Sequence, residues 1–129
     1  LLPTIVEFQR SKSRVLCHND LVADNIFCIT GNRALFIDWE YAQLNDPWFD
    51  LAAIVFYLQL DQHSKGVFLE RYFTQQQTTL KNNESDLIRA TTVLLWGDVL
   101  WHLHTFGNDY KPNLTHKFDW LKRNALAFR

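Results

Sequence analysis

Short apolar segments separated by polar turns occupy the first third of the chain. Residues 14–17, 25–30 and 34–39 are mostly apolar, and a Gly31-Asn32 turn separates the second segment from the third. Segments of this length between turn residues predict β-strands, and the tight turn predicts that the second and third pair as a hairpin. The third segment is apolar nearly throughout, so we expect both of its faces to be buried.

The remainder of the chain has the periodicity of helices. Asp46 followed by Pro47 is a helix-start signal, because Asp can cap free backbone N–H groups and Pro fits the first helical position. The spacing of apolar residues then predicts helices over residues 48–60, 64–76, 84–106 and 114–127. The predicted fold class is therefore α+β, with a small β-hairpin region followed by a mainly helical half.

Two neighbouring stripes of the predicted helix 84–106 differ in composition. One stripe is apolar and is predicted to face the core: Val93, Trp96, Leu100 and Leu103. The other contains Asp98 and Trp101, which are three residues apart and can therefore reach the same place. A carboxylate beside an indole ring favours a positively charged ligand. The alternative is an ordinary half-buried Trp next to a solvated Asp.

The composition predicts one compact domain over residues 1–129. Hydrophobic residues make up 47% of the chain and aromatic residues 15%, which is enough to build a core. No apolar run is long enough to span a bilayer and the first residues are too polar for a secretion signal, so we expect a soluble, cytoplasmic protein. Cys17 and Cys28 lack the spacing of metal ligands and are expected to be reduced and buried.

Acidic residues are concentrated between residues 15 and 64. This stretch holds one basic residue, Arg33, against seven acidic residues, a net charge of −6, whereas the whole chain has a net charge of −1. A nearly neutral chain argues against binding to nucleic acid. The acidic stretch suits a bound cation, either a metal ion or an organic ammonium, and a solvated acidic face is the alternative.

Several polar residues lie where the predicted strands end. Asp20 and Asn25 are five residues apart in the loop between the first two strands, and Asp38 ends the third. If that strand continues, Glu40 shares a face with Asp38 because side chains alternate along a strand. Asn25 and Asp38 offer the hard oxygen ligands that Mg²⁺ prefers, while Asp20 can accept a proton from a substrate hydroxyl. Phosphoryl transfer requires this division of roles.

These motifs resemble those of the kinase-like small-molecule phosphotransferases. Residues His18–Leu21 (HNDL) and Ile37–Tyr41 (IDWEY) are similar in sequence and order to the motifs of choline/ethanolamine kinases, a family that includes bacterial choline kinases and thiamine kinase. Aminoglycoside phosphotransferases share the scaffold but usually have Gly where Asn19 stands. The resemblance implies a protein-kinase-like C-terminal lobe that uses ATP and Mg²⁺ to phosphorylate a small alcohol.

The resemblance also implies roles for individual residues. In the first half of the chain, Asp20 is implied as the catalytic base, and Asn25 and Asp38 as the two Mg²⁺ ligands. Glu40 is implied as an active-site acid. His18 and Asp50 are implied to brace the catalytic loop. Choline kinases line their substrate pocket with Trp from a late helix. This similarity favours Trp101, together with Asp98, as substrate-binding residues.

The similarity in sequence motifs is confined to residues 15–54. The helical remainder of the chain resembles the family only in its predicted architecture. The family places a Gly-rich phosphate-covering loop and a strand Lys in an N-terminal lobe, and neither precedes the motifs of this chain. We therefore expect the C-terminal lobe alone, inactive in isolation, from a kinase of choline, ethanolamine or a similar cationic alcohol. A thiamine or aminoglycoside kinase and a non-catalytic ligand-binding lobe are the alternatives, and the sequence names neither the acceptor nor the oligomeric state.

Overall fold

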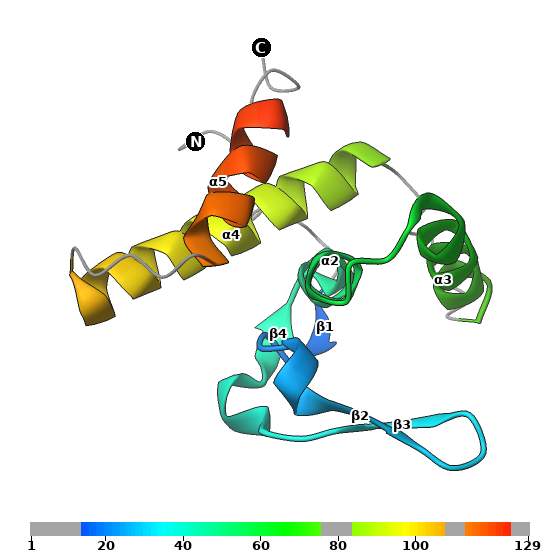
Figure 1. The fold of residues 1–129 in the computed structure, drawn as a ribbon. Helices are drawn as coiled ribbons and strands as arrows, with labels where there is room; N and C mark the ends of the chain where they lie inside the picture. Colours follow the sequence, from blue (N-terminus) through cyan, green and yellow to red (C-terminus); the bar gives the residue numbers. More distant parts are fainter. Residues whose placement is uncertain (1–13, 76–83, 108–112, 125–129) are drawn as a thin grey trace.

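The structure is a computed structural model that describes residues 14–75, 84–107 and 113–124. Figure 1 shows a small β region at one end and helices over the rest of the molecule. The strands and 3₁₀ helices are β1 (Val15–Cys17), η1 (Ala23–Asn25), β2 (Ile26–Ile29), β3 (Arg33–Phe36), η2 (Trp39–Tyr41) and β4 (Gln43–Asn45). The α-helices are α2 (Pro47–Tyr57), α3 (Gln62–Gln75), α4 (Glu84–Phe106) and α5 (Asn113–Asn124). The predicted α+β class is confirmed.

The strands pair as two separate antiparallel sheets. β2 and β3 form the predicted hairpin, with Ile26 opposite Phe36. β1 pairs with β4, a strand that the sequence pattern did not predict, and this pairing places Leu16 opposite Leu44. The predicted continuation of the third strand to residue 39 is wrong, because β3 ends at Phe36 and the chain then turns into η2.

The hairpin is more exposed than the sequence pattern indicated. Three of the four residues of β3 are exposed, so the expectation that both faces of this strand are buried is wrong. Only one face of the hairpin packs on the helices, where Ile26 and Phe36 are partly buried beside Ala53. Cys28 is exposed rather than buried, whereas Cys17 is buried, and both are free thiols as expected.

The capping signal at Asp46 and Pro47 correctly predicted the start of α2. The Asp46 side chain accepts a hydrogen bond from Trp48 N at 2.9 Å, and Pro47 occupies the first turn of α2. The helix ends at Tyr57, before the predicted residue 60, and Gln59 then takes a positive φ of 52°. α3 begins at Gln62, two residues before the predicted start, and α4 has the predicted bounds. The predicted end of the last helix, residue 127, lies outside the described residues.

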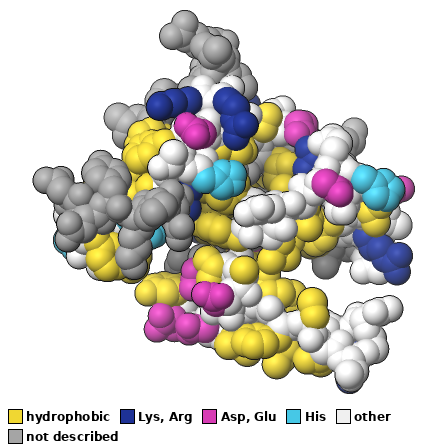
Figure 2. Space-filling model, viewed as in Figure 1, with side chains coloured by type: hydrophobic (Ala, Val, Ile, Leu, Met, Phe, Trp, Pro, Cys, Tyr) yellow, Lys and Arg dark blue, Asp and Glu magenta, His cyan; other side chains and the backbone are white. Residues whose placement is uncertain are grey.

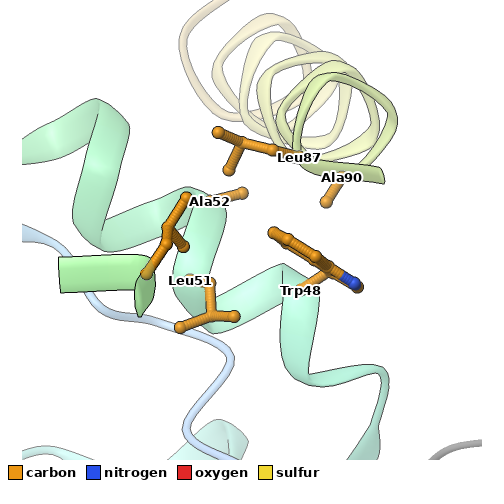
Figure 3. Packing of buried hydrophobic residues seen from close by; sticks show 6 residues of the cluster. Trp48, Leu51, Ala52, Leu87 and Ala90 are labelled. Atoms are coloured by element: carbon orange, nitrogen blue, oxygen red, sulfur yellow. The ribbon is translucent and has the colours of Figure 1, made fainter. Parts of the chain in front are cut away.

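The core lies where α2 packs against α4. Trp48, Leu51 and Ala52 from α2 meet Leu87 and Ala90 from α4, as Figure 3 shows. A smaller cluster joins Leu21, in the loop after β1, to Ala53 and Leu94. Burying each large apolar side chain in this way contributes about 1.5 to 3 kcal/mol to the free energy of unfolding. Because α2 contributes residues to both clusters, it is the element that holds the loop and the helices together.

The predicted core stripe of α4 is wrong. Leu100 is 58% exposed, and Val93, Trp96 and Leu103 are only partly buried. The residues that are buried lie on another face of the helix: Leu87, Ala90, Thr91, Thr92, Leu94, Leu95 and Val99. Apolar residues surround much of this helix, so periodicity alone offers more than one stripe, and packing against α2 and α5 selects the one that is buried. None of the described helices is long and apolar enough to cross a membrane.

Candidate active site

The loop after β1 is anchored to the first turn of α2. The Asp50 carboxylate accepts hydrogen bonds from His18 N at 2.7 Å and Asn19 N at 2.9 Å. Hydrogen bonds to an ionised carboxylate are stronger than neutral ones, so this contact holds the backbone immediately before Asp20. The geometry fits the loop-bracing role that the family resemblance implied for Asp50.

His18 connects the same loop to the segment after β3. Its side chain is 2% exposed, and its Nε2 lies 2.8 Å from Ile37 O. The Nδ1 atom accepts a hydrogen bond from Asp20 N at 3.3 Å. A carbonyl oxygen accepts and an amide N–H donates, so these two contacts match the tautomer with its proton on Nε2. The ring also packs against Trp39, with centroids 4.6 Å apart.

Asn19 is a structural residue that the sequence pattern did not single out as a site residue. It has a positive φ of 65°, a conformation that Asn tolerates better than most residues. Its Nδ2 donates to Cys17 O at 3.2 Å and Tyr41 O at 3.0 Å, and its Oδ1 accepts from Asn45 Nδ2 at 2.7 Å. These bonds connect the loop to the segment between η2 and α2. In the sequence, an Asn within a tight loop is the feature that could have indicated this role.

Asp20 and Asn25 are in direct contact. Asn25 Nδ2 donates hydrogen bonds to Asp20 O at 2.9 Å and to Asp20 Oδ2 at 3.0 Å. Both bonds use the nitrogen of the Asn25 amide, which leaves its carbonyl oxygen Oδ1 as the atom available to a cation. Asn25 is 8% exposed, so burial helps to hold this orientation.

Asp38 lies next to the backbone that pairs with Asn25. Ile37 N donates to Asn25 O at 3.1 Å, and Asp38 follows with a positive φ of 64°, exposed to solvent. The predicted alternation of Asp38 and Glu40 along one strand is therefore wrong, because Asp38 lies in a turn. A carboxylate and an amide oxygen are hard ligands, and this donor set fits Mg²⁺. Within the described part of the chain, no group of three or more His, Cys, Asp or Glu could hold a metal ion.

Three acidic side chains raise the pKa of Tyr41. The charge of Glu40 is the largest cause of the raised pKa of Tyr41, whose hydroxyl also hydrogen-bonds to that carboxylate. The charges of Asp20 and Asp38 raise the same pKa further. Since electrostatic effects on an exposed group fall off with distance, the predicted base, a predicted metal ligand and the predicted active-site acid lie in one neighbourhood.

The two residues predicted to bind substrate on α4 both contact His102, and they differ in exposure and in their other partners. Asp98 is 18% exposed and contacts Lys117, Tyr57 and His102. Trp101 is 54% exposed, and its ring packs against His102, with centroids 5.0 Å apart, and against Phe106. Here the aromatic ring near Asp98 is that of Tyr57.

Tyr57 and Lys117 are site candidates that helical periodicity missed, because they come from α2 and α5. Burial is the main cause that raises the pKa of Tyr57 strongly, followed by the charge of Asp98 and its hydrogen bond. The charge of Asp20 also raises this pKa. The Asp98 cluster therefore lies within electrostatic range of the catalytic loop.

Comparison with known proteins identifies the family. Residues 1–85 match the phosphotransferase enzyme family. The chain belongs to this family. The matched residues include every predicted site residue from His18 to Asp50, whereas Asp98 and Trp101 lie beyond the match.

Individual relatives are similar to this chain over part of their length. Protein LicA of Haemophilus influenzae is 46% identical over 59 residues, which are 46% of this chain and 22% of that protein. The crystal structure of choline kinase LicA from Streptococcus pneumoniae has a TM-score of 0.70 at 23% identity, over 97% of this chain and 46% of that one. A structure of LicA in complex with AMP has a TM-score of 0.71 at 23% identity and similar coverage, 98% and 46%.

A Plasmodium vivax ethanolamine kinase shares the fold as well. Its structure has a TM-score of 0.62 at 21% identity, covering 96% of this chain and 38% of that one. The chain thus spans less than half the length of these relatives. Its fold is that of the choline and ethanolamine kinase structures.

Proposed function

We propose that this chain provides the catalytic base, the metal ligands and the acceptor pocket of a kinase. The reaction transfers the γ-phosphoryl group of ATP to the hydroxyl of a small cationic alcohol such as choline or ethanolamine. The observation that carries the proposal is the Asp20–Asn25 contact, with Asp38 on the adjacent backbone. The family match supports phosphoryl transfer, the LicA complex with AMP supports an adenine nucleotide as donor, and the choline and ethanolamine kinase structures support the acceptor class.

Asp20 is positioned to act as the base. One of its oxygens, Oδ2, accepts from Asn25 Nδ2, while the described residues donate no hydrogen bond to Oδ1. In the reaction, Oδ1 accepts the proton of the acceptor hydroxyl as that oxygen forms a bond to the γ-phosphorus. The bond between that phosphorus and the oxygen of the departing ADP breaks, and Asp20 later releases its proton to solvent.

The remaining residues hold the reacting groups in place. Asn25 Oδ1 and the Asp38 carboxylate would hold Mg²⁺, which neutralises phosphate charge when bound. Asp50 holds the backbone just before Asp20, the His18 ring links Asp20 to Ile37, and Glu40 adds negative charge nearby. Positioning of this kind supplies most of the catalysis in phosphoryl transfer.

We also propose that residues 1–129 act as a single lobe that needs a nucleotide-clamping lobe for turnover. The isolated chain should therefore show little or no transfer with ATP, Mg²⁺ and choline, while the gene product that contains it should be active. We infer a cytoplasmic location, because the reaction draws on the cytoplasmic ATP pool.

The test of the proposal is the loss of activity in Asp20→Ala, made in the gene product that contains this chain. Loss of a general base lowers kcat by about 10² to 10⁴-fold. Asp38→Ala should be at least as damaging, because metal binding is lost with it. Glu70→Ala is the matched control, since Glu70 is an exposed acid on α3 away from the loop, and its kcat should not change. Turnover of Asp20→Ala near that of the unmodified protein overturns the assignment of the base.

An acceptor panel separates the candidate activities. Choline, ethanolamine, thiamine, an aminoglycoside and the neutral carbon isostere of choline are compared by kcat/KM. Choline should be preferred over its neutral isostere by about 30 to 100-fold, as expected for one aromatic contact and one carboxylate. An aminoglycoside as the best acceptor would assign the protein to the antibiotic-phosphorylating branch. Binding of choline without consumption of ATP would favour a non-catalytic lobe.

A further inference from the structure

Asp98 is the centre of a cluster that joins three helices. Its Oδ2 accepts a hydrogen bond from Tyr57 OH at 2.8 Å and forms an ion pair with Lys117 Nζ. Its Oδ1 lies 3.0 Å from His102 Nδ1. Lys117 is 9% exposed, and its ammonium lies 5.7 Å from the centroid of the Tyr57 ring. An ammonium held by a carboxylate and an aromatic face is a complete cation-binding arrangement, and its occupant here is a side chain of the protein.

An open pocket lies beside the Asp98 cluster. A pocket with a volume of about 500 Å³ is bordered by Ala23, Asp24, Tyr57, Gln59, His116 and Lys117. Ala23 and Asp24 belong to η1, between Asp20 and Asn25 of the catalytic loop. The pocket therefore lies between Lys117 and the segment that follows the predicted base, and it is large enough for a small alcohol.

We propose that Lys117 is an internal cation that occupies the binding place of the acceptor's positively charged group. A cationic acceptor displaces the Lys117 ammonium from Asp98 and from the face of the Tyr57 ring. The identity of the acceptor as a cation rests on the proposed function. The exchange of places between the two cations rests on the contacts of Lys117, Asp98 and Tyr57.

The exchange explains how a cation is distinguished from a neutral alcohol of the same shape. Asp98 is mostly buried, and a buried charge that loses its partner is strongly destabilised. A cationic acceptor replaces one positive charge with another, so Asp98 stays paired. A neutral acceptor that displaced Lys117 would leave Asp98 without a cation. Asp24, an exposed acid on the same pocket wall, can receive the released ammonium.

The first experiment measures binding of choline chloride to this chain and to Lys117→Met by calorimetric titration. Removing the internal competitor should tighten choline binding by about tenfold, because the competent site is no longer filled. Binding of the neutral carbon isostere should not gain in the same way. Lys122→Met is the matched control, because Lys122 is an exposed lysine on the same helix, and it should bind choline as the unmodified chain does.

A second measurement uses the unmodified chain and does not depend on the folding of a variant. The rate at which an amine-reactive reagent labels Lys117 is followed by mass spectrometry with and without choline. Choline should raise this rate several-fold, because the Lys117 side chain, now 11% exposed, is released. The neutral isostere should leave it unchanged.

Three outcomes overturn the inference: unchanged or weaker choline binding by folded Lys117→Met, an equal gain for the neutral isostere, or no choline-dependent labelling of Lys117. Failure of the proposed function has a different signature. In that case choline releases Lys117 but no phosphoryl transfer is found in the gene product.

Discussion

Asp50 controls the position of the predicted base without touching a reacting group. Its two oxygens accept the N–H groups of His18 and Asn19, the two residues before Asp20. The loop also depends on the Asn19 side chain, which bonds to Cys17, Tyr41 and Asn45. At the scale of single residues, the loop that carries the predicted base is thus held by side-chain hydrogen bonds, most of them to backbone atoms, in addition to the apolar packing of Leu21.

Asp50→Asn should lower both stability and kcat. An amide has one accepting oxygen and no charge, so at least one of the two charge-assisted bonds is lost, at a cost of about 1.5 to 3 kcal/mol. Urea unfolding measures the stability of the chain, and steady-state kinetics of the gene product measure kcat and KM. Asp86→Asn is the control, because Asp86 makes a half-exposed pair with Arg89 on α4 that contributes about 0 to 1 kcal/mol. Equal losses in the two variants would contradict the anchoring role of Asp50.

The two cysteines should differ sharply in reactivity. Burial raises the pKa of the Cys17 thiol to about 12, and the charge of Asp50 adds to this effect. Cys17 is 1% exposed and its Sγ lies 3.6 Å from the carbonyl oxygens of Asn45 and Asp46, whereas Cys28 is exposed. A thiol reagent at about pH 8 should therefore modify Cys28 in the folded chain and Cys17 only after unfolding, because the thiolate is the reactive form.

Cys28→Ser provides the control for this labelling, since the folded variant should have almost no reactive thiol.

The raised pKa of Cys17 also has a consequence for the stability of the chain. Between the ordinary thiol value of 9.0 and about 12, Cys17 is ionised in the unfolded chain but protonated in the folded one, so stability falls as pH rises through this range. Rapid modification of two thiols in the folded chain would contradict the burial of Cys17.

At the scale of elements, α4 shows which face of a largely apolar helix the fold uses. Leu95→Ala should destabilise the chain by about 2 to 5 kcal/mol, because Leu95 is 0% exposed and its removal leaves a cavity. Leu100→Ala, at 58% exposure, should change stability by less than about 0.5 kcal/mol. Thermal or urea unfolding measures both. The reverse order would favour the stripe that the apolar spacing predicted.

At the scale of the whole molecule, apolar side chains are exposed along the β region. Figure 2 shows hydrophobic side chains along the lower part of the molecule, where Figure 1 places the hairpin, and acidic side chains nearby. The exposed large residues of this region include Leu16, Phe27, Leu35, Trp39, Tyr41 and Leu44. Monomers rarely expose a contiguous apolar surface of more than a few hundred Å², so this side of the chain is suited to association.

The isolated chain should therefore self-associate as its concentration rises, and a paired charge change should reduce this. Leu16 and Leu44 are 66% and 63% exposed and lie opposite each other in the β1–β4 pair. The double variant Leu16→Lys, Leu44→Glu replaces them with opposite charges that can still pair across the strands. Sedimentation velocity measures the association. Gln62→Lys with Gln75→Glu, both exposed on α3, is the control of equal net charge and should associate as the unmodified chain does.

The sequence by itself determined the features that depend on near neighbours. The hairpin turn at Gly31-Asn32, the capped start of α2 and the bounds of α4 follow from local propensities and capping, which act over about four residues. The motifs around Asp20 and Asp38 were also sufficient to indicate the family, because the chemistry requires those residue types in that order.

Only the tertiary structure decided what each of these side chains contacts. Local patterns carried no signal for β4, for the buried face of α4, or for the Asn25 amide turned toward Asp20. The spacing of Asp98 and Trp101 carried no signal for the bonds that Asp98 makes with Tyr57, 41 residues before it, and with Lys117, 19 residues after it. The physical reason is that burial and ion pairing depend on which elements pack together, and that choice is made by contacts between segments far apart in the chain.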